Sequence, residues 1–453
     1  MTENHEEHIW PGYGRGATFT ESRPVARIAK PLRRFMHVEA AGGVVLLIAT
    51  VAALAFANSP VGDSIAEFWE EELTLIEFGD FRLSESLVHW INDGLMAIFF
   101  FVVGLEIKQE LVTGELRDPR RAALPAIAAV GGMVVPAAVF LLFNVGGAGA
   151  DGWGIPMATD IAFAVGVLAL LGSRVPAALK VFLLTLAIVD DIGAILVIAV
   201  FYTSEISWGW FTAALIGIAA IVGLRLISVW YIPVYVVVGT GVWVAMLQSG
   251  IHATIAGVVL GLLTPAKPLR PKSTQIAIEP THSWDTIRST LFDAKETISV
   301  AGRLQHAIHP WTAFFVLPLF AFANAGIEIS NESLSEAASS PVTIGIIMGL
   351  VVGKPVGIVA AAWLADVTRI GRRPAGVTWR HIIGAGALAG IGFTVSIFVT
   401  GLAYDDPVIV ADAKIGVLVA SIIAAMLGVI TLSRQSSKAD FSPDTVGVGS
   451  DDQ

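Results

Sequence analysis

Two adjacent aspartates, Asp190 and Asp191, lie in the middle of an apolar run that extends from Pro176 to Tyr202. A helix over this run is long enough to span a bilayer, and the two acids fall close to its midpoint. Each carboxylate at that depth costs roughly 2.5–3.5 kcal/mol of insertion free energy. Because the chain carries this cost twice, the pattern predicts that the two charges hold a cation or a proton partway across a membrane.

The composition indicates a polytopic membrane protein. Of the 453 residues, 55% are hydrophobic and only 15% are charged, whereas soluble domains carry about 25% charged residues. The chain has no cysteine, so disulfides, thiolate metal sites and a cysteine nucleophile are excluded. No basic block with interleaved aromatic residues accompanies the net charge of −10, and no nucleic-acid partner is therefore expected.

The predicted fold class is an all-α polytopic membrane protein with twelve transmembrane helices, one for each apolar run. The runs cover residues 37–57, 88–107, 122–143, 153–171, 176–202, 209–224, 231–248, 251–264, 309–327, 341–365, 381–402 and 411–432. The first run is interpreted as an uncleaved helix, because its polar lead is too long for a signal peptide. This organisation gives a cytoplasmic tail over 1–36, a transmembrane domain over 37–432 with a cytoplasmic loop over 265–308, and a cytoplasmic tail over 433–453.

Basic residues orient these spans. With the N-terminus inside, every Lys and Arg except Arg82, Lys354 and Lys414 falls in an inner segment, which is 25 of 28. The outer segments are acidic instead, as the positive-inside rule requires. Lys354 is the one cation that the prediction places deep in the membrane, at the centre of the tenth span.

Two predicted spans carry helix-breaking residues in their interiors. The fourth span has Gly and Pro over residues 152–161, and the eleventh has four glycines over residues 384–396. Because the two spans are seven apart, they run in opposite directions, which points to inverted-topology repeats with two discontinuous crossing helices. Glycine-rich membrane helices can also simply pack closely. The pairing of the two spans, together with Asp160 in the fourth, favours the inverted repeat.

The acidic pair predicts an exchanger. Successive residues of a helix point about 100° apart, so one carboxylate can face a water-filled funnel while the other turns toward a neighbouring helix. Burial, together with the negative charge of a neighbouring carboxylate, favours protonation of the pair. The hard oxygens of both groups also suit small hard cations. A site that holds either protons or one cation exchanges them, because each ligand evicts the other. No cofactor is expected.

Asp160 and Lys354 leave two interpretations open. In the first, they balance the partial charges where half-helix ends meet, with the carboxylate at the positive ends and the ammonium at the negative ends. In the second, Lys354 pairs with one of the central carboxylates and itself loses a proton during transport. Thr159 is expected either to cap a half helix or to contribute an oxygen to the site.

A third group of residues lies at the cytoplasmic mouth. It is either an ordinary set of interfacial side chains or a titrating, pH-responsive cluster, since histidine changes charge between pH 5 and 8. Its members are Glu106, Lys108, Glu110, His306 and His309.

The motifs resemble those of the NhaA-type bacterial sodium/proton antiporters over about residues 36–432. The matching motifs lie at residues 103–108, 158–163, 186–195, 249–254, 309–311, 317–326, 353–355 and 390–394. The resemblance implies electrogenic exchange of more than one proton per Na⁺ or Li⁺, with Asp190 and Asp191 as the cation and proton site and with Asp160 and Lys354 at the helix crossing. It also implies a bacterial inner membrane, a homodimer formed partly through the segment between spans 1 and 2, and activation at alkaline pH.

This chain departs from the family pattern at two positions, because Gln109 and Gln305 stand where well-known members carry charged residues of the pH-responsive cluster. Its 265–308 loop and its tails are also longer than usual.

Two rival functions are weaker. An intramembrane aspartyl protease, the enzyme alternative, needs its two aspartates on separate helices, one in a Gly-x-Gly-Asp context that this chain lacks. A proton-coupled carrier of an organic substrate would place aromatic and Arg groups deep in the spans, whereas the interior charges here are almost all carboxylates. We therefore expect a transporter of Na⁺, Li⁺ and H⁺ rather than an enzyme.

Overall fold

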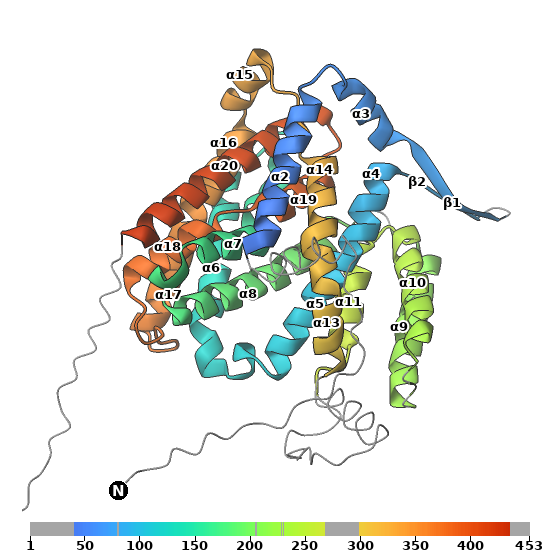
Figure 1. Ribbon diagram of the computed structural model, residues 1–453, viewed down its shortest axis with the longest axis horizontal. Coiled ribbons are helices and arrows are strands. Elements are labelled where there is room, and N and C mark those ends of the chain that lie inside the picture. The colour runs from blue at the N-terminus through green and yellow to red at the C-terminus, as the bar shows by residue number, and fades with distance from the viewer. Residues whose placement is uncertain are drawn as a thin grey trace, which may run out of the picture.

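The computed structural model describes residues 40–78, 81–203, 206–227, 229, 231–267 and 299–434. The predicted N-terminal tail, the predicted C-terminal tail after residue 434 and most of the predicted 265–308 loop lie outside these residues. The described part is almost entirely helical, with one two-stranded sheet (Figure 1).

The first half of the chain begins with two helices and a hairpin and ends at the helix that carries the acidic pair. Its elements are α2 (Ala40–Ala57), α3 (Gly62–Glu70), β1 (Glu72–Phe78), β2 (Phe81–Ser86), α4 (Leu87–His89), η1 (Trp90–Leu95), α5 (Met96–Val112), η2 (Glu115–Arg117), α6 (Pro119–Asn144), η3 (Ala150–Met157), α7 (Ile161–Leu170), η4 (Gly172–Arg174) and α8 (Ala177–Phe201).

Every secondary-structure element in the described second half is a helix. Its elements are α9 (Trp208–Leu226), α10 (Ile232–Gln248), α11 (Thr254–Leu263), α13 (Val300–Trp311), η5 (Thr312–Val316), α14 (Leu317–Asn324), α15 (Asn331–Ser339), α16 (Pro341–Met348), η6 (Gly349–Gly353), α17 (Lys354–Val367), α18 (Trp379–Ala389), α19 (Phe393–Ala403) and α20 (Pro407–Ser433).

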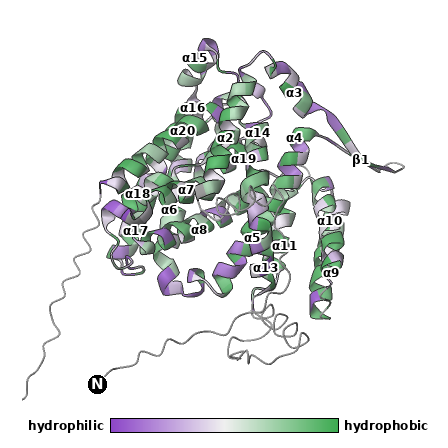
Figure 2. Cartoon of the chain, viewed as in Figure 1, coloured by the Kyte–Doolittle hydropathy of each residue, from purple (hydrophilic) through white to green (hydrophobic). Residues whose placement is uncertain are grey.

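Seven helices within the described residues are long and apolar enough to cross a membrane, or up to nine if each of two bent helix pairs counts as one span. The helices α10 and α11 are apolar but shorter. Figure 2 shows hydrophobic residues along the helix bundle and hydrophilic ones at its ends, in α15, around the hairpin and between α5 and α6. The chain is thus a multi-pass membrane protein.

The ninth predicted run begins too late. The helix there starts at Val300 rather than at residue 309, and Pro310 lies inside it. The Ser299 hydroxyl accepts a hydrogen bond from the Gly302 amide at 3.1 Å and caps this start. An amphipathic lead-in of this kind stays helical at an interface, where hydropathy alone cannot find it.

A β-hairpin that the sequence did not predict projects from the segment between α3 and α4 (Figure 1). The strands β1 and β2 are antiparallel, with Glu72 opposite Ser86 and Phe78 opposite Phe81, and the register shifts between Thr74 and Ile76. The Trp90 indole donates to the Leu73 carbonyl at 2.9 Å and ties the hairpin to the bundle.

The helix α8 lies at the centre of the bundle, where it contacts α5, α6, α7, α18 and η3 (Figure 1). Beside it, α6 packs closely on α17 because glycines face each other: a Cβ at Gly131 would collide with the Gly357 carbonyl, and one at Gly357 with the Gly131 carbonyl. Small residues let two membrane helices approach this closely. The contact fixes α17, whose first residue is Lys354, against the middle of the bundle.

Candidate functional site

Two interrupted helical segments meet beside α8. The first breaks at residues 158–160, between η3 and α7, and the second at residues 390–392, between α18 and α19, where the axis bends by 46°. Pro156 in the first segment and Gly390 and Gly392 in the second disfavour a continuous helix.

Hydrogen bonds join the two breaks. The Asp160 amide donates to the Ile391 carbonyl at 2.7 Å, and the Ser396 hydroxyl donates to the Ile155 carbonyl at 2.7 Å. Backbone groups that the breaks release from helical pairing are satisfied across the contact, as a membrane interior demands.

Asp160 serves the starts of two half helices at once. Its Oδ1 accepts from the Phe163 amide at 3.0 Å, which makes Asp160 the N-cap of α7. Its Oδ2 accepts from the Thr394 amide at 3.0 Å and from the Thr394 hydroxyl at 2.5 Å, at the start of α19. A carboxylate here offsets the positive ends of both helix dipoles.

Asp190 and Asp191 are buried, with 1% and 6% of their surfaces exposed. Oδ2 of Asp190 accepts from the Lys354 ammonium at 2.6 Å and from the Thr159 hydroxyl at 2.5 Å. Within the described part of the chain, Oδ1 of Asp190 has no hydrogen-bond partner. A fully buried carboxylate oxygen without a partner is rare and costly, and such atoms concentrate at functional sites.

Lys354 makes the contacts that both interpretations require. Neither side chain of the Lys354–Asp190 pair is exposed. The ammonium also donates to the Met157 carbonyl, which is at the negative C-terminal end of η3. Lys354 therefore offsets a half-helix end and pairs with a central carboxylate at the same time.

Thr159 lies at the junction of the break with α8. Asp160, rather than Thr159, caps α7. The Thr159 hydroxyl lies 2.5 Å from Oδ2 of Asp190 and 3.0 Å from the Ala389 carbonyl in the second break. This threonine thus brings an oxygen to the acidic pair.

Of the five residues predicted to form a cluster, only Glu106 takes part in the side-chain hydrogen bonds that link α5 to α13 among the described residues. Glu106 accepts from the Gln305 amide at 3.0 Å, and Gln109 donates to the Gln305 carbonyl oxygen at 2.5 Å, so three side chains link α5 to α13. Gln109 and Gln305 are the two positions at which the chain departs from the family pattern that it otherwise resembles. Glu110 instead accepts from the Glu115 amide at 2.9 Å. The side chains of His306 and His309 are exposed on α13.

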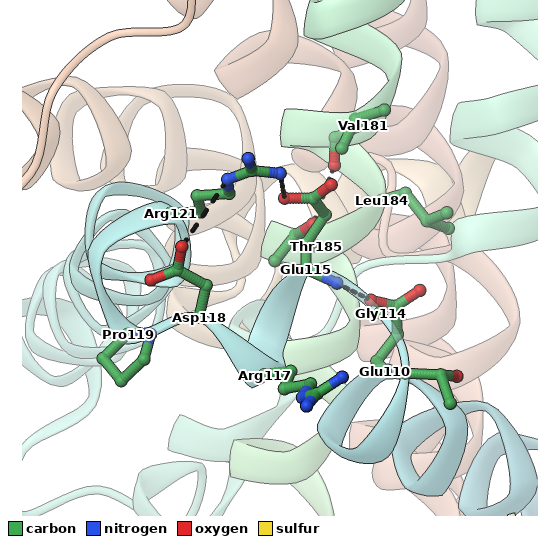
Figure 3. Close-up of a pocket in the computed structure, with 11 residues that line it drawn as sticks. Glu110, Gly114, Glu115, Arg117, Asp118, Pro119, Arg121, Val181, Leu184 and Thr185 are labelled. Carbon is green, nitrogen blue, oxygen red and sulfur yellow. Dashed lines mark hydrogen bonds and ion pairs between the residues drawn. The ribbon is translucent and has the colours of Figure 1, made fainter. Parts of the chain in front are cut away.

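A pocket of about 680 Å³ lies beside the N-terminal part of α8 (Figure 3). Val181, Leu184 and Thr185 of α8 form one wall. The other wall comes from the end of α5, from η2 and from the start of α6, where Arg121 pairs with Asp118 at 3.6 Å and with Glu115 at 3.9 Å. Apart from the positive-inside charges, no pattern in the sequence distinguishes these residues.

Groups of three or more His, Cys, Asp or Glu side chains that could hold a metal ion do not occur among the described residues.

A multi-pass bundle whose central helix buries an acidic pair against a lysine, beside two interrupted segments, has the features of an ion-coupled membrane transporter. The sequence signature of the family described as Na⁺/H⁺ antiporter 1 matches residues 33–432, and the chain belongs to this family. The resemblance predicted from the motifs is thereby confirmed.

Three relatives bear the name Na(+)/H(+) antiporter NhaA. The protein of Oleidesulfovibrio alaskensis is 45% identical over 441 residues, which cover 92% of this chain and 98% of the relative. That of Rhodopirellula baltica is 46% identical over 423 residues, or 90% of this chain and 94% of the relative. That of Rhizobium meliloti is 45% identical over 428 residues, or 91% and 97%.

Proposed function

We propose that this protein exchanges Na⁺ for H⁺ across the membrane, and that Asp190 and Asp191 form the shared binding site. The observation that carries the proposal is the fully buried Lys354–Asp190 ion pair, in which one carboxylate oxygen of Asp190 has no hydrogen-bond partner among the described residues. The next residue, Asp191, is a second buried acid. The names of the relatives support the identity of the two ions. They do not favour a carrier of organic substrates or an enzyme.

The chemistry of the site supports an electrogenic exchange. Two carboxylates can hold two protons, whereas like-charge repulsion lets them hold one monovalent cation between them. Exchange of one Na⁺ for two protons moves one net charge across the membrane. Thr159 and the backbone carbonyls released at the breaks supply neutral oxygens for Na⁺ or for the smaller Li⁺.

The proposed topology is twelve spans in inverted repeats, with η3–α7 and α18–α19 as the discontinuous crossing pair. Both tails and the 265–308 loop are then cytoplasmic, in the inner membrane of a bacterium, and lipid covers the exposed apolar faces of α9 and α10. In this orientation the pocket beside Thr185 is the cytoplasmic approach to the acidic pair. The distribution of Lys and Arg supports this orientation.

Everted membrane vesicles test the exchange. Once respiration has acidified their lumen, addition of Na⁺ or Li⁺ is expected to collapse the pH gradient reported by a fluorescent amine, while K⁺ or choline is not. An imposed membrane potential should change the rate, because the exchange moves charge. A gradient that persists after addition of Na⁺ and Li⁺ at every pH from 6 to 9 would rule out the proposed activity.

We also propose a homodimer through the hairpin. Leu73, Leu75 and Ile76 expose 44%, 57% and 49% of their surfaces, and neither strand pairs with a further strand on its outer edge in the described structure. Because the chain has no cysteine, Leu75→Cys is expected to cross-link two copies through a short bis-maleimide in the membrane. Ser335→Cys, on exposed α15, is the matched control, and the reagent should not cross-link two copies of this variant. Equal cross-linking of both variants would contradict the hairpin interface.

A further inference from the structure

Two tyrosine hydroxyls hold η3 from two different helices. Tyr202, the C-cap of α8, donates to the Asp151 carbonyl at 2.7 Å and accepts from the Gly154 amide at 3.1 Å. Its hydroxyl thus contacts both groups that a 3₁₀ turn would pair with each other. Tyr404, the C-cap of α19, donates to the Gly149 carbonyl at 2.7 Å.

Glycines let the hydroxyls reach the backbone of η3. A Cβ at Gly152 would collide with the Tyr404 hydroxyl, and a Cβ at Gly154 would lie 2.7 Å from the Tyr202 hydroxyl. Tyr404 is only 8% exposed. These are close, directed contacts between side chains and backbone, which any displacement of η3 must break.

Tyr202 also contacts an aromatic ring of η3 and a histidine that precedes α11. Trp153 of η3 stacks on the Tyr202 ring with the centroids 6.4 Å apart, and Trp153 also meets Phe201 edge-on at 5.0 Å. The His252 Nε2 lies 2.5 Å from the Tyr202 carbonyl. Two segments distant in sequence, η3 and the residues just before α11, therefore contact the end of α8.

The two ends of α8 differ. Near its start, Val181 and Thr185 line the open pocket. Beyond Asp190 the helix continues for twelve residues to Tyr202, or about 18 Å at the usual helical rise, and there the tyrosines bind η3. The same η3 ends at Met157, whose carbonyl holds Lys354. The acidic pair thus lies between the end of α8 that lines the pocket and the end that contacts η3.

We propose that Tyr202 and Tyr404 form a tyrosine clamp that holds η3 closed over the outer side of the acidic pair, and that release of both hydroxyls accompanies exposure of the pair to that side. The inference rests on the proposed Na⁺/H⁺ exchange and its orientation. Both tyrosines act through η3 and are positioning residues, not ligands of the ion.

Replacement of each tyrosine by phenylalanine isolates the hydroxyl. The ring and its packing remain, and in Tyr202→Phe the Gly154 amide and the Asp151 carbonyl can pair directly. Loss of one net hydrogen bond corresponds to about a fivefold change in an equilibrium. Each single variant is therefore expected to raise the outward-exposed population about fivefold, and the double variant by roughly 25-fold if the two free-energy changes add.

Cysteine accessibility measures this population, because the chain has no cysteine of its own. Thr400→Cys is the outer reporter: Thr400 is fully buried on α19, one turn beyond Ser396 and on the same face toward η3. Leu184→Cys, in the pocket, is the inner reporter. A membrane-impermeant trimethylammonium methanethiosulfonate is added to right-side-out vesicles for the outer reporter and to everted vesicles for the inner one.

Labelling of the outer reporter should rise in the order parent, single variants and double variant, while the inner reporter does not become more reactive. Tyr235→Phe is the matched control, since its hydroxyl donates to the Val229 carbonyl at 2.8 Å away from the site; it should leave both rates unchanged. Unchanged outer labelling in the double variant overturns the clamp. A parallel rise at both reporters does so too, because it indicates general loosening.

A transport measurement in the same vesicles tests the proposed tyrosine clamp separately from the proposed Na⁺/H⁺ exchange on which it rests. If the Na⁺-dependent collapse of the pH gradient is present but the labelling does not respond, the clamp is wrong and the exchange stands. If no exchange occurs in the parent, the proposed function fails first. Ser335→Cys, exposed on α15, reports the orientation, because it should react only in right-side-out vesicles.

Discussion

Replacement of Asp190 or Asp191 by Asn is expected to reduce Na⁺-dependent collapse of the pH gradient in everted vesicles at least about 100-fold, a loss of roughly 3 kcal/mol or more in binding and transport together. Asn has nearly the shape of Asp but neither takes up a proton nor carries a charge for Na⁺. An exchanger whose two ligands compete for one carboxylate pair loses both reactions when either member is neutralised.

The two variants should differ in stability although they share the loss of transport. Asp191→Asn leaves the Lys354–Asp190 ion pair intact, so its expression and thermal unfolding should match those of the parent protein. Asp190→Asn leaves the buried ammonium of Lys354 without its counter-ion and should also unfold at a lower temperature.

Asp366→Asn is the matched control for both variants. Asp366 pairs with Arg373 at 3.1 Å near the end of α17, where both side chains are partly exposed. The same chemical change there should leave exchange close to the parent rate. Parent-like transport in both Asp190→Asn and Asp191→Asn would contradict the assignment of the site.

The sequence was sufficient to find the charged residues of the candidate site but not their contacts. Asp190, Asp191 and Lys354 stand out because ionised side chains are costly inside a membrane, and that cost depends on local sequence alone. The partner of Lys354 depends instead on the position of α17 relative to α8 and η3. That position is fixed by the close packing of Gly131 on α6 against Gly357 on α17, a contact that lies outside the site.

Contacts across the two breaks were equally out of reach. The hydrogen bonds between Asp160 and Thr394 join residues 234 positions apart. No local sequence pattern shows that the N-cap residue of one half helix will also bind the start of a second half helix. Polar residues at ordinary helix ends, such as Tyr202 and Tyr404, carry no signal in hydropathy. The hairpin was missed because its seven-residue strand β1 begins at the last of three consecutive glutamates, a pattern that is typical of a solvated loop.

Replacement of Lys354 by Ala is expected to cost about 3–5 kcal/mol of folding free energy, the usual effect of removing one partner from a buried ion pair. Asp190 must then remain as an unpaired charge or take up a proton, and a cavity replaces the lysine stem. Because proton uptake becomes harder as the pH rises, the drop in the thermal midpoint of the purified protein should be larger at pH 8.5 than at pH 6.

The double variant Lys354→Ala/Asp190→Asn separates the loss of the pair from the loss of the ammonium as such. It buries neither charge, so it should regain most of the stability lost in Lys354→Ala, whereas transport should stay absent because Asp190 is gone. In the single variant, any residual exchange should keep the parent's preference between Na⁺ and Li⁺, since Lys354 contacts a carboxylate oxygen and a carbonyl and is not itself a cation ligand. An unchanged thermal midpoint together with an unchanged pH profile would mean that the lysine neither balances the half helix nor compensates Asp190.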